Sequence, residues 1–173
     1  MSPVSQLTTR LTFRLNILAW DLSHAIWRQY GPRHDLSVAE WRVLAVVAEL
    51  GEAGTREVCA VTRLHKARAS RILGRLAKRG LVERLDGLTD RRTAPHRLSE
   101  RGQQAHAEIS ETATAFEEAL LSKLTPLERL GVDQAVKVLQ SAVADVSDTG
   151  ETRQSGALEG ATVFTGKPGL VLG

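Results

Sequence analysis

The sequence has a single cysteine, Cys59, only 4% aromatic residues and no long apolar run. One cysteine excludes a disulfide within the chain and is compatible with a reducing compartment. No segment approaches the roughly 20 apolar residues that cross a bilayer, and the N-terminus lacks a signal peptide's basic start and apolar centre. The chain is therefore expected to be cytoplasmic, without a membrane partner. Its 173 residues suffice for one domain with a real core.

Signatures of catalysis are also missing. The sequence contains no P-loop, no dinucleotide fingerprint and no recognisable nucleophile–base arrangement. The five histidines show no metal-ligand spacing with one another or with Cys59. We therefore expect no enzyme activity, no cofactor and no metal site.

Positive charge is concentrated in the middle of the chain. Residues 51–102 hold 13 lysines and arginines against 6 aspartates and glutamates, a balance of +7, whereas the whole chain carries +3. A basic segment on an otherwise mildly acidic protein is typical of a polyanion binder.

Hydrophobic periodicity and capping residues predict four helices in the first part of the chain. The first spans residues 7–30 and should end at Gly31-Pro32, and the second follows a capping box formed by Ser37 and Glu40. A short helix over 55–60 and a helix over 64–79, ended by Gly80, come next.

Two strands and two further helices are predicted beyond Gly80. Residues 81–85 and 94–98 should form a hairpin, in which Pro95 makes the second strand an edge or leaves it partly paired. Ser99 should cap a long helix with an apolar stripe of Ala105, Ile109, Thr112, Phe116, Leu120 and Leu124. A capping box over 125–128 begins a last helix that should end near Val146, and residues 147–173 are predicted to be a flexible tail.

The helix over 64–79 has one strongly basic face. Five cations fall within an arc of roughly 100°, beside an apolar arc that should pack on the preceding helices. The cations are Arg68, Arg71, Arg75, Lys78 and Arg79. A solvated charged face is the alternative, but this face lacks the glutamate partners usual on a salt-bridged surface helix.

A short helix, a tight connection and this basic helix match a helix-turn-helix, whose second helix enters the major groove of DNA. We predict base contacts near its N-terminal end and phosphate contacts further along. The base-contact candidates are His65, Lys66, Arg68, Ser70 and Arg71, and the phosphate candidates are Arg75 and Lys78. The hairpin would be a wing, in which Asp90 holds one of Arg91 and Arg92 while the other enters the minor groove.

At these residues the chain resembles the MarR family of bacterial winged-helix repressors. Residues 64–82 (LHKARASRILGRLAKRGLV) resemble the family's recognition helix and the Gly-Leu-Val that follows it. A second likeness, to the family's wing signature, lies in Arg84, Asp90-Arg91-Arg92, Leu98-Ser99 and Gly102. The likeness covers about residues 6–146, with two departures: His65 replaces the usual Ser or Asp cap, and Pro95-His96 interrupts the second wing strand.

The resemblance implies a mainly α fold, a winged helix-turn-helix with a small β-hairpin wing, flanked by N- and C-terminal dimerisation helices. Residues 1–35 and 99–146 would supply those helices and residues 36–98 the DNA-binding lobe. It also implies a homodimer that binds a pseudo-palindromic DNA site. Small aromatic or phenolic ligands, or cysteine oxidation, would relieve this DNA binding. Apolar stripes on the terminal helices favour the dimer as well, the alternative being an intramolecular core.

A cluster of residues on the first helix and the single cysteine are candidates for effector sensing. Trp20, His24 and Trp27 share one face of the first helix, so with Arg28 they are the predicted effector contacts; the alternative is that the tryptophans are core or dimer anchors. Trp41 is expected to pack beneath the first helix. Cys59 is interpreted as a small core residue, with a redox switch as the alternative.

The sequence therefore predicts a DNA-binding transcriptional regulator, a repressor, that acts on double-stranded DNA as a homodimer. The alternative from another class is a winged-helix interaction module that binds a protein and does not read DNA sequence. The operator, the effector and the choice between repression and activation are left open by the sequence.

Overall fold

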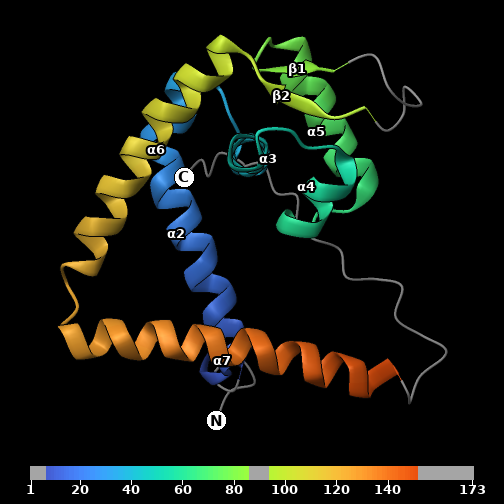
Figure 1. The fold of residues 1–173 in the computed structure, drawn as a ribbon. Helices are drawn as coiled ribbons and strands as arrows, with labels where there is room; N and C mark the ends of the chain where they lie inside the picture. The colour runs from blue at the N-terminus through green and yellow to red at the C-terminus, as the bar shows by residue number, and fades with distance from the viewer. Residues whose placement is uncertain (1–6, 86–93, 152–173) are drawn as a thin grey trace, which may run out of the picture. The chain divides into compact units, whose positions relative to one another are not determined.

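The computed structural model describes residues 7–85 and 94–151, and the chain divides into two compact units, residues 1–121 and 122–173. The first unit contains the helices α2 (Leu11–His34), α3 (Val38–Leu50), α4 (Thr55–Thr62), α5 (Lys66–Lys78) and α6 (Glu100–Leu121), and the strands β1 (Val82–Arg84) and β2 (His96–Leu98) (Figure 1). This architecture confirms a mainly α winged helix-turn-helix with a small hairpin.

The core of this unit is built around α3. Val43, Leu44 and Val47 are fully buried there, and they pack with apolar side chains from α4, α5 and α6. The helix begins at the predicted capping box, because the Ser37 hydroxyl accepts from the Glu40 amide at 3.3 Å and the Glu40 carboxylate accepts from the Ser37 amide at 3.0 Å.

The predicted end of the first helix at Gly31-Pro32 is wrong, because α2 continues to His34. A Cβ at Gly31 would collide with the Trp27 indole, whose Nε1 donates to the Leu36 carbonyl at 2.8 Å. This packing holds the last turn in place although Pro32 lacks the N–H of a regular helix. The helix ends instead at Asp35, which has the left-handed backbone typical of a C-terminal cap.

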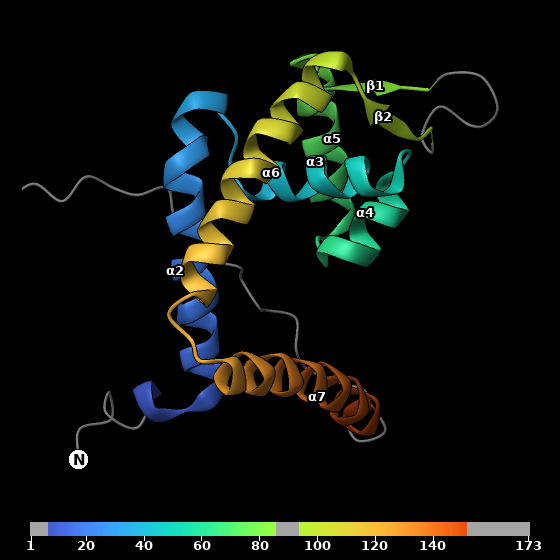
Figure 2. The same ribbon diagram turned by 60° about the vertical axis from the view of Figure 1, so that its left-hand side comes forward.

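The hairpin pairs β1 with β2 in antiparallel register, with Val82 opposite Leu98 (Figure 2). As predicted, β2 is an edge of the two-stranded sheet, and His96 also forms an isolated bridge with Ala53, with N–H···O distances of 2.9 Å in both directions. Pro95 stands one residue before the strand, where its missing N–H costs nothing, and its carbonyl accepts from the Leu85 amide at 2.9 Å. Arg84, at the other end of β1, faces His96 across the pair.

Ser99 and Gly102 join α6 to the end of α5. The Ser99 hydroxyl donates to the Gly80 carbonyl at 2.6 Å and accepts from the Gly102 amide at 3.0 Å, which confirms Ser99 as the cap of α6. A Cβ at Gly102 would collide with the backbone carbonyl of Leu81. Only a glycine therefore lets the first turn of α6 lie this close to Leu81.

The predicted stripe of α6 is buried only near its beginning. Ala105 and Ile109 are in the core, whereas Leu120 is 42% exposed. The part of the apolar stripe that follows Ile109 is thus not buried in the core of this unit.

The second unit contains α7 (Pro126–Glu151), which starts at the predicted capping box of Thr125 and Glu128. It runs five residues beyond the expected end near Val146, and residues 152–173 of the predicted tail lie outside the described residues. Within the described ranges, no helix is both long and apolar enough to span a membrane.

Candidate nucleic-acid interface

A tight turn orients α5 against α4. Arg63, the cap of α4, takes a left-handed backbone with φ of 58°, and the Thr62 hydroxyl accepts from the Leu64 amide at 3.3 Å. His65 then becomes the cap residue of α5, without a side-chain capping bond. The chain thus enters α5 two residues later than the apolar pattern predicted.

Four apolar side chains fix which face of α5 points outward. These are Ala69, Ile72, Leu73 and Leu76, all at most 1% exposed. At 100° per residue the opposite face consists of small and basic residues, all exposed: Ala67, Ser70, Arg71, Gly74 and Lys78. This set is called the outer face of α5 below.

The outer face combines two cations with three small residues. Arg71 and Lys78 provide positive charge. The side chains of Ala67, Ser70 and Gly74 are small or absent, so a ligand can come close to the helix backbone there. The predictions from sequence missed Ala67 and Gly74, because they were based on charge alone. The signal was present in the 3.6-residue period, which places both residues on the same face as Arg71 and Lys78.

The predicted base-contact residues gather in the first two turns of α5. His65, Lys66, Ser70 and Arg71 are exposed, and Arg68 is partly buried. The Arg71 Nε donates to the Ala67 carbonyl at 3.2 Å, which holds that side chain along its own helix. Their predicted contacts with bases remain predictions, and the wing residues Asp90, Arg91 and Arg92 lie outside the described residues.

Two of the five cations on the predicted basic face have partners on other segments of the protein. The Arg75 Nε donates to the Glu40 carboxylate at 2.9 Å, and Arg79 donates to the backbone carbonyls of Asp35 and His34 at 2.7 and 2.8 Å. The inference that this face lacks acidic partners is therefore wrong for Arg75, and also for Arg79, whose Nη2 lies 3.6 Å from the Asp35 carboxylate. The partners come from α2 and α3, more than 30 residues earlier, which a helical pattern cannot reveal.

These contacts hold α5 in place. Arg75 ties its third turn to the start of α3, and Arg79 satisfies the last carbonyls of α2, which a basic side chain at a helix C-terminus does favourably. Lys78, further out on the same helix, is exposed and retains its predicted role as a phosphate contact. Arg75 is 55% exposed, so its predicted phosphate contact stays a prediction beside its contact with Glu40.

Glu40 is 8% exposed. Burial raises the pKa of its carboxyl, but hydrogen bonds from Ser37 and the guanidinium of Arg75 lower it further, so the net pKa lies below the ordinary value. Glu40 is therefore ionised at neutral pH, and the stability it contributes is lost only as the pH falls through its depressed pKa.

Replacing Glu40 with glutamine should lower the free energy of unfolding by about 1 kcal/mol at pH 7, because a capping bond and a screened ion pair are lost. The difference from the wild type should vanish as the pH falls well below 4.5, the ordinary pKa, because Glu40 is then protonated. Urea titrations at several pH values measure both. Glu52→Gln, in the exposed turn after α3, is the matched control, and a difference that persisted in acid would contradict this assignment.

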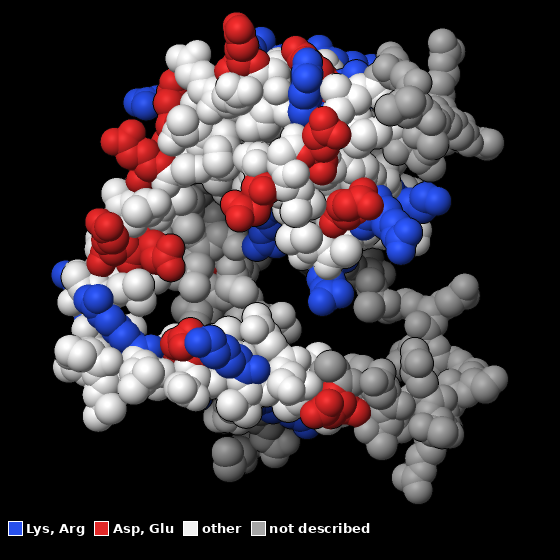
Figure 3. Space-filling view, viewed as in Figure 1, with Lys and Arg blue, Asp and Glu red and all other residues white. Residues whose placement is uncertain are grey.

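Basic and acidic side chains are unevenly distributed over the first unit. Figure 3 shows acidic side chains following α6, whereas basic ones project beside α4. The glutamates of α6 are Glu100, Glu108, Glu111, Glu117 and Glu118. Negative charge thus lies on α6, apart from the outer face of α5.

The predicted aromatic face on α2 is confirmed as a set of contacting rings. The Trp20 and His24 rings stack with centroids 3.9 Å apart, and His24 and Trp27 are 6.4 Å apart. Trp27 packs against the core, which supports its interpretation as an anchor, while Trp20 is 59% exposed and Arg28 is also exposed. A ligand on this face remains a prediction.

Trp41 contacts Tyr30 of α2, as expected, and also stacks on His106 of α6 with ring centroids 5.4 Å apart. Burial raises the pKa of Tyr30 to about 12 and lowers that of His106, so both side chains are neutral in the folded protein at pH 7. Cys59 is half-buried and packs against the same core, as its structural interpretation requires.

Comparison with known proteins agrees with this geometry. The model of the MarR family matches residues 34–93, from the end of α2 into the hairpin. A solved MarR/EmrR family transcriptional regulator from Acinetobacter sp. ADP1 superposes with a TM-score of 0.69 and 25% identity, over 78% of this chain and 94% of that one. Residues 34–93 are therefore similar to the MarR family, and the chain has the winged-helix fold of its regulators.

Two further proteins are similar to this chain. BpsR from Bordetella bronchiseptica superposes with a TM-score of 0.66 and 22% identity, over 76% of this chain and 99% of BpsR. The HTH-type transcriptional regulator Hpr of Bacillus licheniformis is 25% identical over 117 residues, which are 68% of this chain. The match spans only 57% of the length of Hpr.

Proposed function

We propose that this chain is a MarR family transcriptional repressor that binds a pseudo-palindromic site on duplex DNA as a homodimer. The outer face of α5 carries the proposal. Its small residues allow the helix backbone to come close to base edges, and Arg71 and Lys78 match the acceptors of bases and phosphates. His65 and Lys66 stand at the N-terminal end of α5, the end by which a recognition helix enters the major groove.

The exposed apolar side chains of α2 and α7 support the homodimer. In the first half of α2, Leu11, Leu15 and Leu18 lie on one face and are between 41 and 53% exposed. In the second unit, the large apolar side chains that α7 exposes include Leu127, Leu130, Val132, Val136, Val138, Val143 and Val146. Helices with this much exposed apolar surface need a partner in water, and a second copy supplies matching surfaces. Residues 1–35 and 99–146 would then form the dimerisation region.

We also propose that a small aromatic ligand relieves DNA binding at Trp20, His24, Trp27 and Arg28. The stacked Trp20 and His24 rings present an exposed aromatic surface, and Arg28 adds a cation beside it. The structure of BpsR concerns regulation of that protein's DNA binding by 6-hydroxynicotinic acid, an aromatic acid, which supports a ligand of this kind.

A gel-shift experiment with the DNA upstream of the chain's own gene tests the proposal, with sedimentation of the same preparation. The expected result is a dimer that shifts this DNA and not a shuffled sequence of equal length. A folded dimer that bound neither DNA at low salt would overturn the proposal and favour a winged-helix module that binds a protein.

A further inference from the structure

The Glu40 carboxylate uses its two oxygens for two different segments of the chain. Its Oε2 accepts from the Ser37 amide at 3.0 Å and from the Ser37 hydroxyl at 2.7 Å, as part of the capping box. Its Oε1 accepts from the Nε of Arg75, 35 residues further along the chain, at 2.9 Å. The cap that begins α3 thus also fixes the direction of a side chain on α5.

Glu40 is the fixed member of this pair. Its side chain is 11% exposed, whereas that of Arg75 is 55% exposed. A buried carboxylate with both oxygens in hydrogen bonds has little freedom, while an exposed arginine has many rotamers. The contact therefore orients Arg75 and leaves Glu40 where the cap holds it.

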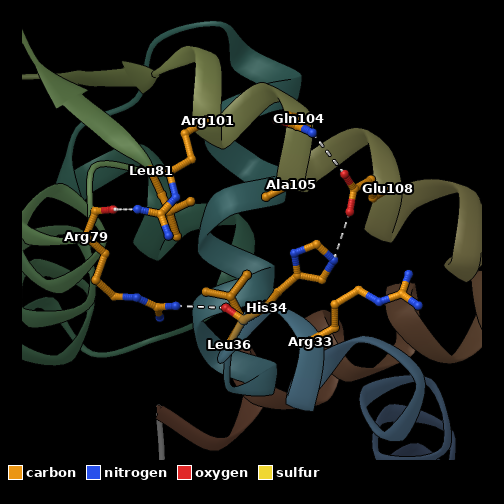
Figure 4. A pocket seen from close by; sticks show the side chains of 9 residues that line it. All are labelled: Arg33, His34, Leu36, Arg79, Leu81, Arg101, Gln104, Ala105 and Glu108. Atoms are coloured by element: carbon orange, nitrogen blue, oxygen red, sulfur yellow. Dashed lines mark hydrogen bonds and ion pairs between the residues drawn. The ribbon is translucent and has the colours of Figure 1, made fainter.

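The contact leaves the outer end of the Arg75 guanidinium available. Arg75 binds Glu40 through Nε, and no described residue accepts from its two Nη nitrogens. Arg79, one turn later, differs because it donates Nη1 to the Asp35 carbonyl and Nη2 to the His34 carbonyl, toward the end of α2 (Figure 4). A guanidinium that is held at Nε and has unused donors at both Nη nitrogens matches the oxygens of a phosphate.

Arg75 lies at the border between the outer face of α5 and its buried face. It follows Arg71 by four residues, which places it one turn further along and about 40° round the helix from Arg71. A recognition helix in the major groove presents its outer face to the base edges and its flanks to the phosphates along the groove. Arg71 is therefore placed for a base and Arg75 for a phosphate.

We propose that Glu40 is a positioning residue for DNA binding, which holds the Arg75 guanidinium with its Nη nitrogens toward a phosphate of the operator. Glu40 itself makes no contact with DNA. The conformational freedom of Arg75 is restricted before the DNA arrives, so less entropy is lost when the phosphate binds. This inference rests on the proposed function, because it concerns how the same interface holds its DNA.

The negative charge of Glu40 gives the proposal a test that long-range electrostatics cannot imitate. A carboxylate repels the DNA backbone, so its removal alone should strengthen DNA binding. Loss of positioning acts in the opposite direction. If a glutamine at this position accepts from the Ser37 amide through its oxygen, its own amide nitrogen faces the Arg75 Nε, and two donors do not bond. Glu40→Gln should therefore release Arg75 and weaken DNA binding although it removes a negative charge.

Fluorescence anisotropy with the full-length chain, on the operator and on single-base variants of it, measures the effect. Glu40→Gln should weaken binding about three- to tenfold and by the same factor on each DNA, because phosphates carry no sequence information. In an Arg75→Ala background the same substitution should no longer weaken binding, since the side chain that it positions is gone. Glu52→Gln, which removes a negative charge from the exposed turn after α3, should not weaken binding.

Ser37→Ala separates positioning from capping. It removes the cap hydroxyl but retains the backbone amide and the contact of Glu40 with Arg75. It should therefore lower the free energy of unfolding and leave the operator affinity of the folded protein unchanged.

An operator affinity of Glu40→Gln equal to or higher than that of the wild type would overturn the proposal. So would an equal weakening by Glu40→Gln with and without Arg75, or an equal weakening by Ser37→Ala, because Glu40 would then act through the fold. These outcomes leave the proposed function intact. A folded wild-type chain that bound no operator would overturn the proposed function and this inference with it.

Discussion

Replacing Arg71 with alanine should weaken operator binding by about 1–3 kcal/mol, roughly fivefold to 150-fold, and should relax selectivity at one base pair. Arg71 lies on the outer face of α5 in its second turn, where the Nε bond to Ala67 holds the side chain along the helix. Its guanidinium suits the paired acceptors of guanine, and alanine removes these donors without disturbing the buried face.

Fluorescence anisotropy on the operator and on single-base variants would measure both effects. Arg97→Ala is the matched control, because Arg97 is an exposed arginine on β2 that pairs with Glu83 at 3.2 Å. Its loss should alter affinity much less. Full affinity and unchanged base preference in Arg71→Ala, with a folded dimer, would remove Arg71 from the base contacts.

Replacing Gly102 with alanine should lower the free energy of unfolding by about 2–3 kcal/mol. The added Cβ meets the backbone carbonyl of Leu81, and a backbone group cannot turn aside as a side chain can. The same carbonyl accepts from the Ser99 amide at 3.2 Å, so shifting it also disturbs the start of α6.

Gly74→Ala is the matched control for this prediction. A Cβ at Gly74 meets nothing within 4 Å, so alanine should raise the free energy of unfolding by about 0.5–1 kcal/mol through its better helix propensity. Denaturant titrations of both variants at one protein concentration would measure the opposite signs. Equal stabilities of Gly102→Ala and the wild type would show that the first turn of α6 tolerates a displacement from Leu81.

Local signals predicted the beginnings of helices well. The capping boxes at Ser37 and Thr125 and the cap at Ser99 were all found from sequence, because each consists of residues three apart that satisfy one another's backbone groups. The outward direction of α5 was also predictable, since its apolar residues recur at the helical period.

Errors arose where distant segments meet. Gly31 and Pro32 look like a helix end until Trp27 and Leu36 are placed together, and no local pattern indicated the bridge between His96 and Ala53. The partners of Arg75 and Arg79 were missed for the same reason. The resemblance to the wing signature pointed to Gly102, and the structure supplies its physical cause in the contact with Leu81.

The partners of Arg75 and Arg79 also affect how ionic strength would act on the proposed DNA complex. A cation that neutralises a phosphate releases condensed counterions, and each such contact adds about 0.9 to the slope of log affinity against log salt. In the folded protein, Arg75 donates to the Glu40 carboxylate, and Arg79 donates to the backbone carbonyls of Asp35 and His34. The Glu40 and Asp35 carboxylates offset part of the charge of these two arginines within the protein. The basic face should therefore release fewer ions on DNA than five positive charges suggest.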